Sequence, residues 1–192
     1  MHIAKNKDLA KLILKGLLIT GAVAVASTSP MFVSLALPKV KKYLAYKIKN
    51  RKKREKRFYN TFYYLKKNDL INFENHGGQI YISLTKEGKK RAGKYQIDDL
   101  EIKKPDKWDG YWRILIFDIK DKEKLKREAL RGKIKELGLF QLQKSVWVYP
   151  YEFQKEVKLL RSFFGLNQEE MEIITANRIE NDKKLRAHFH LA

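Results

Sequence analysis

The feature that most restricts the fold of this chain is a run of 23 residues, 16–38, that contains no charged side chain. A run of that length can span a bilayer. The basic residues before it (Lys5, Lys7 and Lys11) and the small residues after its apolar centre also match the layout of a cleaved signal peptide. The run must therefore be assigned before any other part of the chain.

Three details favour core helices over a membrane segment. Lys15 interrupts the most apolar part of the segment. Residues 27–30, Ser-Thr-Ser-Pro, are a turn and helix-cap pattern, which divides the run into two shorter helices. The i, i+3, i+4 spacing of a helix with one buried face relates Leu9, Leu12, Ile13, Leu17 and Thr20. We therefore predict a buried helix pair over residues 9–37, with a membrane anchor and a cleaved signal peptide as the alternatives.

The charge of the chain is large and unevenly distributed. Its 192 residues include 42 Lys+Arg and 22 Asp+Glu, for a net charge of +20. Residues 1–95 have a net charge of +17, and residues 96–192 one of +3. The densest part, residues 39–57, has 11 basic residues and one acidic residue. This excess predicts a polyanionic partner, either nucleic acid or an anionic membrane.

The absence of cysteine excludes a disulfide scaffold, a thiol nucleophile and a Cys-ligated metal site. The four histidines (His2, His76, His188 and His190) have no metal-ligand spacing. We expect no cofactor from these patterns.

The patterns after Pro38 predict a winged helix-turn-helix domain over residues 1–95. One amphipathic helix buries Val40, Tyr43, Leu44 and Ile48, and a second, starting near Asn50, buries Phe58, Phe62 and Leu65. Residues 70–73 and 80–84 are expected strands of a hairpin, and Thr85 is the expected cap of a short helix over residues 86–92. The run LINFENHGGQIYISLTKEGKKRA resembles the wing of bacterial winged-helix regulators, where a hairpin precedes a Leu-Thr-x-x-Gly turn.

A recognition helix needs one apolar face for the core and one basic, polar face for the major groove of duplex DNA. The second helix has this pattern. Arg54, Arg57 and Asn60 are the expected base-reading residues, and the remaining cations are expected to contact phosphates. The full predicted DNA-binding set is Lys52, Lys53, Arg54, Lys56, Arg57, Asn60, His76 and Gln79.

Residues 96–107 are polar, acidic and contain a proline, and we predict them as a linker to a second domain over residues 108–192. Expected strands cover 112–119, 139–142, 145–149 and 171–176, and expected helices cover 120–137 and 151–164. In the first of these helices, Leu125, Ala129, Ile134 and Leu137 are predicted to point inward. The order β-α-β-β-α-β is that of a ferredoxin-like domain, so the predicted fold class is α+β.

Two runs in this second part, WDGYWRILIFDI and LRGKIKELGLFQLQKSVWVYP, resemble the PaaX-type transcriptional regulators. They are equally similar to the small CRISPR-associated adaptation nuclease, the second Cas protein, which shares this domain. The residues that carry the resemblance are 117–119, Arg127, Arg131, 137–138 and 143–147. The resemblance implies a homodimer that binds double-stranded DNA and regulates transcription, as a repressor in the cytoplasm at the nucleoid.

The resemblance also leaves an alternative open, in which the protein is a metal-dependent endonuclease or a component of CRISPR adaptation that uses Asp118. In the nuclease family, the aspartate that ends the first strand contributes to a metal site, and Asp118 is the matching position. If the protein is a nuclease, Asp118 is the candidate catalytic residue and metal ligand, with Mg²⁺ as the cofactor. An aspartate after a buried strand also often caps the next helix, and our expectation leans against an enzyme.

Overall fold

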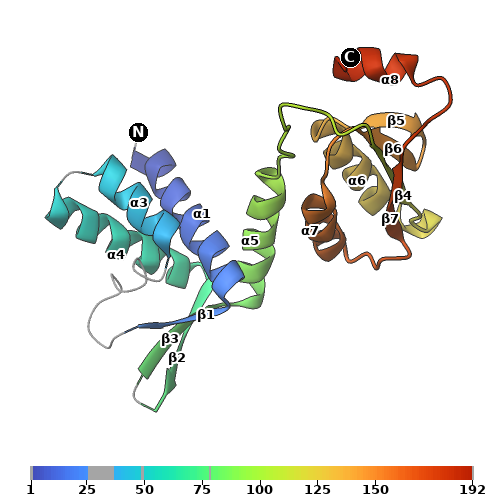
Figure 1. The fold of residues 1–192 in the computed structure, drawn as a ribbon. Coiled ribbons are helices and arrows are strands. Elements are labelled where there is room, and N and C mark those ends of the chain that lie inside the picture. Colours follow the sequence, from blue (N-terminus) through green and yellow to red (C-terminus); the bar gives the residue numbers. More distant parts are fainter. Residues whose placement is uncertain (1, 26–36, 49, 78, 192) are drawn as a thin grey trace. The chain divides into compact units, whose positions relative to one another are not determined.

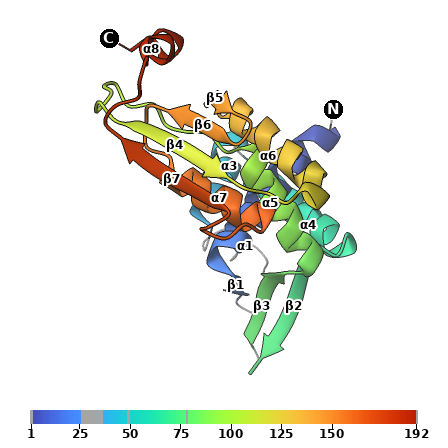
Figure 2. The ribbon, with the colours of Figure 1, turned by 90° about the vertical axis from the view of Figure 1, so that its right-hand side faces the viewer.

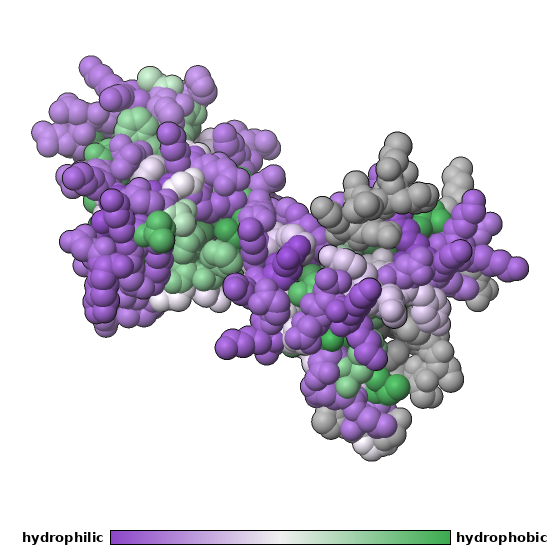
Figure 3. Space-filling model, turned by 180° about the vertical axis from the view of Figure 1, so that it is seen from behind, coloured by the Kyte–Doolittle hydropathy of each residue, from purple (hydrophilic) through white to green (hydrophobic). Residues whose placement is uncertain are grey.

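The computed structural model describes residues 2–25, 37–48, 50–77 and 79–191, and gives only the backbone of residues 2–7, 22–25, 51 and 76. The chain divides into two compact units, Met1–Asp98 and Asp99–Ala192, coloured from blue to green and from green to red in Figure 1. Hydrophilic side chains cover most of the face drawn in Figure 3, on both units. No described helix is both long and apolar enough to cross a membrane.

The first unit consists of helices packed beside a three-stranded sheet. Its elements are α1 (His2–Thr20), β1 (Ala22–Val25), α3 (Pro38–Lys47), α4 (Arg51–Lys67), β2 (Ile71–His76), β3 (Gln79–Leu84) and α5 (Lys86–Asp98). The strand order is β1-β3-β2, and both pairings are antiparallel. The hairpin β2–β3 projects away from the helices of this unit in both ribbon views (Figures 1 and 2).

Helix α1 is the centre of the first core. Leu9, Ile13 and Leu17 are fully buried, because four-residue steps place them on one face of the helix. The cluster also contains Val40 and Leu44 of α3 and Phe58, Phe62 and Leu65 of α4, together with residues of the hairpin and of α5. The predicted apolar faces of the helices after Pro38 are therefore those that the structure buries.

The prediction of a helix pair over residues 9–37 is wrong at residues 22–25, which form strand β1. Helix α1 ends before Gly21, whose φ of +79° lies in the left-handed region that glycine adopts without strain. β1 then pairs with β3 in a register that joins Ala22 to Ser83 and Val25 to Ile80. The second helix of the pair falls on residues that the structure does not describe.

A Leu-Thr-x-x-Gly motif connects the hairpin to α5. Thr85 Oγ1 donates to Asp69 O (2.6 Å) and accepts from the Gly88 backbone N–H (2.9 Å), which caps the first turn. A Cβ on Gly88 would lie 1.9 Å from Leu70 O, so only glycine fits there. The helix does not end at Ala92 as predicted but runs to Asp98, because Ala92 and Ile97 extend its buried face.

The second unit contains an antiparallel sheet of four strands with the order β5-β6-β4-β7 (Figure 2). Its elements are β4 (Trp112–Phe117), the short 3-10 helix η1 (Asp121–Glu123), α6 (Lys124–Glu136), β5 (Phe140–Gln143), β6 (Val146–Tyr149), α7 (Gln154–Phe164), β7 (Met171–Ala176) and α8 (Lys183–Phe189). The chain is thus α+β, and this unit has the predicted order β-α-β-β-α-β, followed by α8.

Two predicted details of the second unit are wrong. Leu125 is 88% exposed and Ala129 is also exposed, because the buried face of α6 is formed by Leu130, Lys133 and Ile134. Helix α7 begins at Gln154 and not at residue 151. The residue before it, Phe153, is buried and has a non-helical backbone conformation.

A cluster on the face of the sheet beside α8 closes this unit. Trp112 and Val148 are fully buried against Leu185 of α8, with Ile114 and Phe189 packed around them. The chain beyond the ferredoxin-like order therefore covers part of a sheet face.

Candidate functional site

Helix α4 separates an apolar face from a basic face. Asn50 caps it by accepting from the Lys53 backbone N–H through Oδ1 (3.1 Å), and Phe58, Phe62 and Leu65 anchor it in the core. Lys52, Lys53, Lys56 and Asn60 are exposed, while Arg54 is half-buried. Lys52, Lys53, Lys56 and Asn60 are therefore brought together on the exposed side of one helix, whereas Arg54, four residues before the buried Phe58, lies nearer the core.

Arg57 differs from the other predicted contacts on α4. Its Nη2 donates to the Tyr43 hydroxyl (3.1 Å), and its guanidinium lies 5.7 Å from the centre of the Tyr43 ring. These contacts tie α4 to α3. Arg57 thus positions the two helices against each other, a role that the sequence pattern did not indicate.

The two hairpin residues of the predicted set lie apart from the helix. His76 and Gln79 are opposite each other in the β2–β3 register, next to the turn at Gly77. The Gln79 side chain is exposed and its Oε1 accepts from the Tyr81 hydroxyl (3.2 Å). The side chain of His76 lies outside the described residues.

A second group of cations in the first unit was not predicted as a site. Lys86, Lys89, Lys90 and Lys94 are exposed on α5, and steps of three and four residues place them along one stripe. Their spacing was visible in the sequence, but the expected end of the helix at Ala92 hid its full length.

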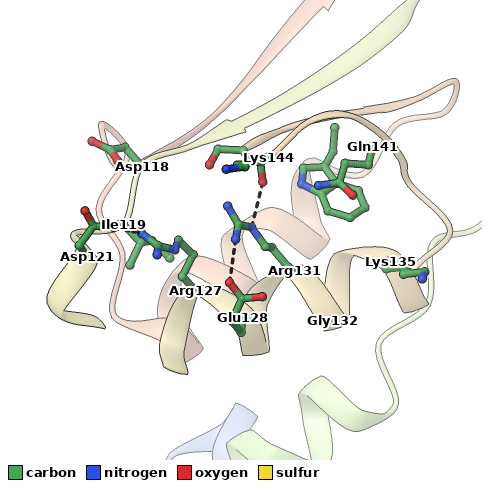
Figure 4. A pocket seen from close by; sticks show the side chains of 12 residues that line it. Asp118, Ile119, Asp121, Arg127, Glu128, Arg131, Gly132, Lys135, Gln141 and Lys144 are labelled. Carbon is green, nitrogen blue, oxygen red and sulfur yellow. Dashed lines mark hydrogen bonds and ion pairs between the residues drawn. The ribbon is translucent and has the colours of Figure 1, made fainter. Parts of the chain in front are cut away.

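The second unit contains a hollow of about 690 Å³ between α6, the turn from β5 to β6 and the end of β4 (Figure 4). We call it the α6 hollow. The residues that line it are Asp118, Ile119, Asp121, Arg127, Glu128, Arg131, Gly132, Lys135, Gln141, Lys144, Ser145 and Trp147. In Figure 4, Asp118 lies at one edge and Lys135 at the other, with Arg127 and Arg131 between them.

Hydrogen bonds hold the two arginines of the α6 hollow in place. Arg127 Nη1 donates to Asp121 Oδ1 (2.6 Å) and to Ile119 O (3.2 Å). The same guanidinium holds the pKa of the exposed Asp121 carboxyl below its usual value. Arg131 Nε donates to Lys144 O (2.9 Å) and its Nη1 to Glu128 Oε1 (2.7 Å). The β5–β6 turn is thereby fixed to α6.

A comparison with family models matches residues 105–187 to the PaaX protein central Cas2-like domain. The second unit is therefore similar to this domain over residues 105–187. This match confirms the resemblance inferred from the sequence around residues 117–119 and 143–147. A search of the curated proteins found no match.

Asp118, the candidate metal ligand, lies at the rim of the α6 hollow. Its carboxylate is exposed at the end of β4, and its backbone N–H donates to Glu170 O (2.9 Å). Among the described residues, no group of three His, Cys, Asp or Glu side chains could hold a metal ion. The hollow that Asp118 borders is lined by four cationic and three acidic side chains.

Proposed function

We propose that this PaaX-like protein is a DNA-binding transcriptional regulator, and that its first unit is a winged helix domain. The element order supports this assignment. Helices α3 and α4 are followed by the β2–β3 hairpin, and β1 completes a small sheet beside it. In a winged helix the hairpin is the wing, and the helix before it is the recognition helix.

The observation that carries the proposal is the two-faced character of α4. Its buried face holds Phe58 and Leu65 at 0% exposure, while Lys52, Lys53 and Lys56 are exposed. Exposed cations on a rigid helix neutralise phosphates and release counterions, so the binding they produce depends steeply on salt. The three exposed lysines at positions 52, 53 and 56 would give a slope of about −3 in log K against log salt for each protomer.

The test measures binding of the full chain to a duplex at several salt concentrations. Lys53→Glu and Arg54→Glu are each expected to weaken binding by about tenfold and to reduce the salt slope by about one. Lys155→Glu is the control, since Lys155 is exposed on α7 in the other unit. Equal weakening by the control and by the α4 variants, with no change of slope, would contradict an α4 interface.

We further propose that the protein acts as a homodimer and represses transcription by occupying a promoter on the nucleoid. The sheet of the PaaX-like domain supports self-association. Ile116 and Ile174 are 37% and 45% exposed on the central and edge strands of the sheet, next to the area that α8 covers. A two-fold dimer would present two copies of α4 to a pseudo-palindromic site.

Analytical ultracentrifugation tests the dimer. The double variant Ile116→Glu/Ile174→Glu is expected to sediment as a monomer, because it would bury two carboxylates in an apolar contact. Leu125→Glu is the matched control, since Leu125 is an exposed apolar residue on α6. If the double variant forms dimers of unchanged stability, the dimer interface does not include Ile116 and Ile174.

The alternative function is a metal-dependent endonuclease, and it rests on the Cas2-like match together with Asp118 at the end of β4. A dimer would bring two Asp118 side chains into one assembly, which a single chain does not offer. Incubation with Mg²⁺ or Mn²⁺ and labelled DNA or RNA tests it. Cleavage that is lost in Asp118→Ala would support the nuclease, and no cleavage by the wild type would reject it.

A further inference from the structure

The α6 hollow has more positive charge available than its acidic residues neutralise. Arg127, Arg131 and Lys135 recur at intervals of four residues, which places them along one face of α6. Lys144 faces them from the β5–β6 turn. Carboxylates pair with Arg127 and Arg131, whereas within the described part of the chain neither Lys135 nor Lys144 has a carboxylate partner.

Two hydrogen-bond donors at the α6 hollow are buried without an acceptor among the described residues. They are Nε of Arg127 and Nε1 of Trp147, whose residue is 3% exposed. Because almost no surface of these two atoms is accessible, a molecule in the hollow would meet the accessible ends of the cationic side chains and not these two atoms. Arginine and lysine side chains only donate, so a molecule bound among them would supply acceptor oxygens.

Gly132 keeps the middle of the α6 hollow open. It lies inside α6, where glycine costs about 1 kcal/mol relative to alanine, and a Cβ there would have no atom within 4 Å. Packing within this chain therefore does not require a glycine. Its lack of a side chain leaves room between Arg131 and Lys135 for a ligand.

We propose that the α6 hollow binds a phosphate group, from a free phosphorylated compound or from a nucleic-acid backbone. A phosphate has two negative charges at most and three acceptor oxygens, and it matches the fork of an arginine. The four cationic side chains that line the hollow offer more donors than one carboxylate could occupy. The site is separate from α4, and the inference does not depend on the first unit binding DNA.

Calorimetric titration of the full chain with inorganic pyrophosphate is the first test. The wild type is expected to bind saturably, and Lys135→Gln and Lys144→Gln are each expected to weaken binding by about tenfold, the effect of one lost charge-assisted contact. Gly132→Leu is expected to abolish binding by filling the hollow, and its thermal unfolding is measured in parallel. Lys124→Gln is the control, because Lys124 is exposed on α6 but does not line the hollow.

Titration with a DNA duplex then identifies the source of the phosphate. If pyrophosphate binds and the lysine variants weaken it, the hollow takes free phosphorylated compounds. If only the duplex responds to Lys135→Gln/Lys144→Gln, the hollow contacts a nucleic-acid backbone. The proposal is overturned if neither probe responds to the double variant. Arg54→Glu affects duplex binding alone, so the failure of an α4 interface remains distinguishable from the failure of this site.

Discussion

At the scale of single residues, the buried Arg113 holds together the run Trp-Asp-Gly-Tyr-Trp-Arg, because it binds Asp109 within the run. Arg113 is 4% exposed. Its guanidinium donates to both carboxylate oxygens of Asp109, to Glu152 Oε1 (2.8 Å) and to Pro150 O (2.9 Å). The chain before β4 is thereby tied to the chain after β6.

The ion pair between Arg113 and Asp109 makes the free energy of unfolding depend on pH. The guanidinium lowers the pKa of the Asp109 carboxyl to about 2 from its usual 3.8. A carboxyl whose pKa is depressed on folding adds stability above its unfolded pKa and loses it as the pH falls through the folded pKa. Asp109→Asn should therefore lower the free energy of unfolding at pH 6, by about 1 kcal/mol because Asp109 is half exposed and screened.

Urea unfolding at pH 6 and pH 2.5 measures this difference. The gap between wild type and Asp109→Asn should shrink at the lower pH. Asp106→Asn serves as the control, since Asp106 is exposed. A gap that is constant with pH would mean that the Asp109 charge contributes nothing.

A second residue-scale prediction concerns the cap of α4. Asn50→Ala removes the only described side-chain acceptor at the start of this helix, the bond from the Lys53 N–H, and should destabilise the first unit by about 1 kcal/mol. Asn50→Ser should retain most of the stability because serine is also a good cap. Thermal unfolding monitored by circular dichroism compares the two. Equal losses in both variants would argue against capping as the cause.

At the scale of elements, periodicity predicted the helix α4 but not the strand β1. Phe58, Phe62 and Leu65 recur at helical spacing, and α4 buries them. The strand β1 could not be predicted in the same way, because Ala22–Val25 is short, lies inside an apolar run and pairs with Ile80–Ser83, far along the chain. Its structure depends on a non-local partner.

The sequence pattern also failed to identify which face of α6 is buried. Lys133 is 7% exposed and occupies the buried face, and its Nζ reaches Glu136 Oε1 (3.2 Å) at the rim. A lysine can bury its stem and keep its ammonium near water. A pattern that treats lysine as polar throughout therefore selects Leu125 and Ala129 instead. The α6 hollow was not predicted for a different reason, because its lining residues come from three elements that are separate in the sequence.

Two glycines inside helices give opposite predictions for the same substitution. Gly88→Ala would place a Cβ 1.9 Å from Leu70 O and should cost about 3 kcal/mol or more, because backbone would have to move. Gly132→Ala meets no atom within 4 Å and should stabilise α6 by up to about 1 kcal/mol. Denaturant unfolding of both variants checks the signs. Destabilisation by Gly132→Ala would show that the space beside it is occupied in solution.

At the scale of the whole molecule, the two units differ in net charge, and each has its own buried cluster. The first unit has most of the net positive charge of the chain. The buried cluster around Leu9 and Phe58 draws only on residues of this unit, and the cluster around Trp112 only on the second. Each unit thus has an apolar core of its own.

Separate cores predict separate unfolding. Gly88→Ala should lower the midpoint of one calorimetric transition, and Arg113→Ala that of another, since each changes the core of one unit. Differential scanning calorimetry of the full chain measures both. A single transition that both variants shift equally would show that the units unfold as one.

Strand β1 has a consequence for how this protein can be shortened. It occupies one edge of β3, while β2 occupies the other. A chain that began at residue 26 would lose α1 with its core residues, and it would also leave the backbone N–H and C=O groups of residues 80–83 without their β1 partners. An open edge of that kind is a template for a strand from another molecule. We therefore expect such a truncation to aggregate through the edge of β3 that β1 covers in the intact chain.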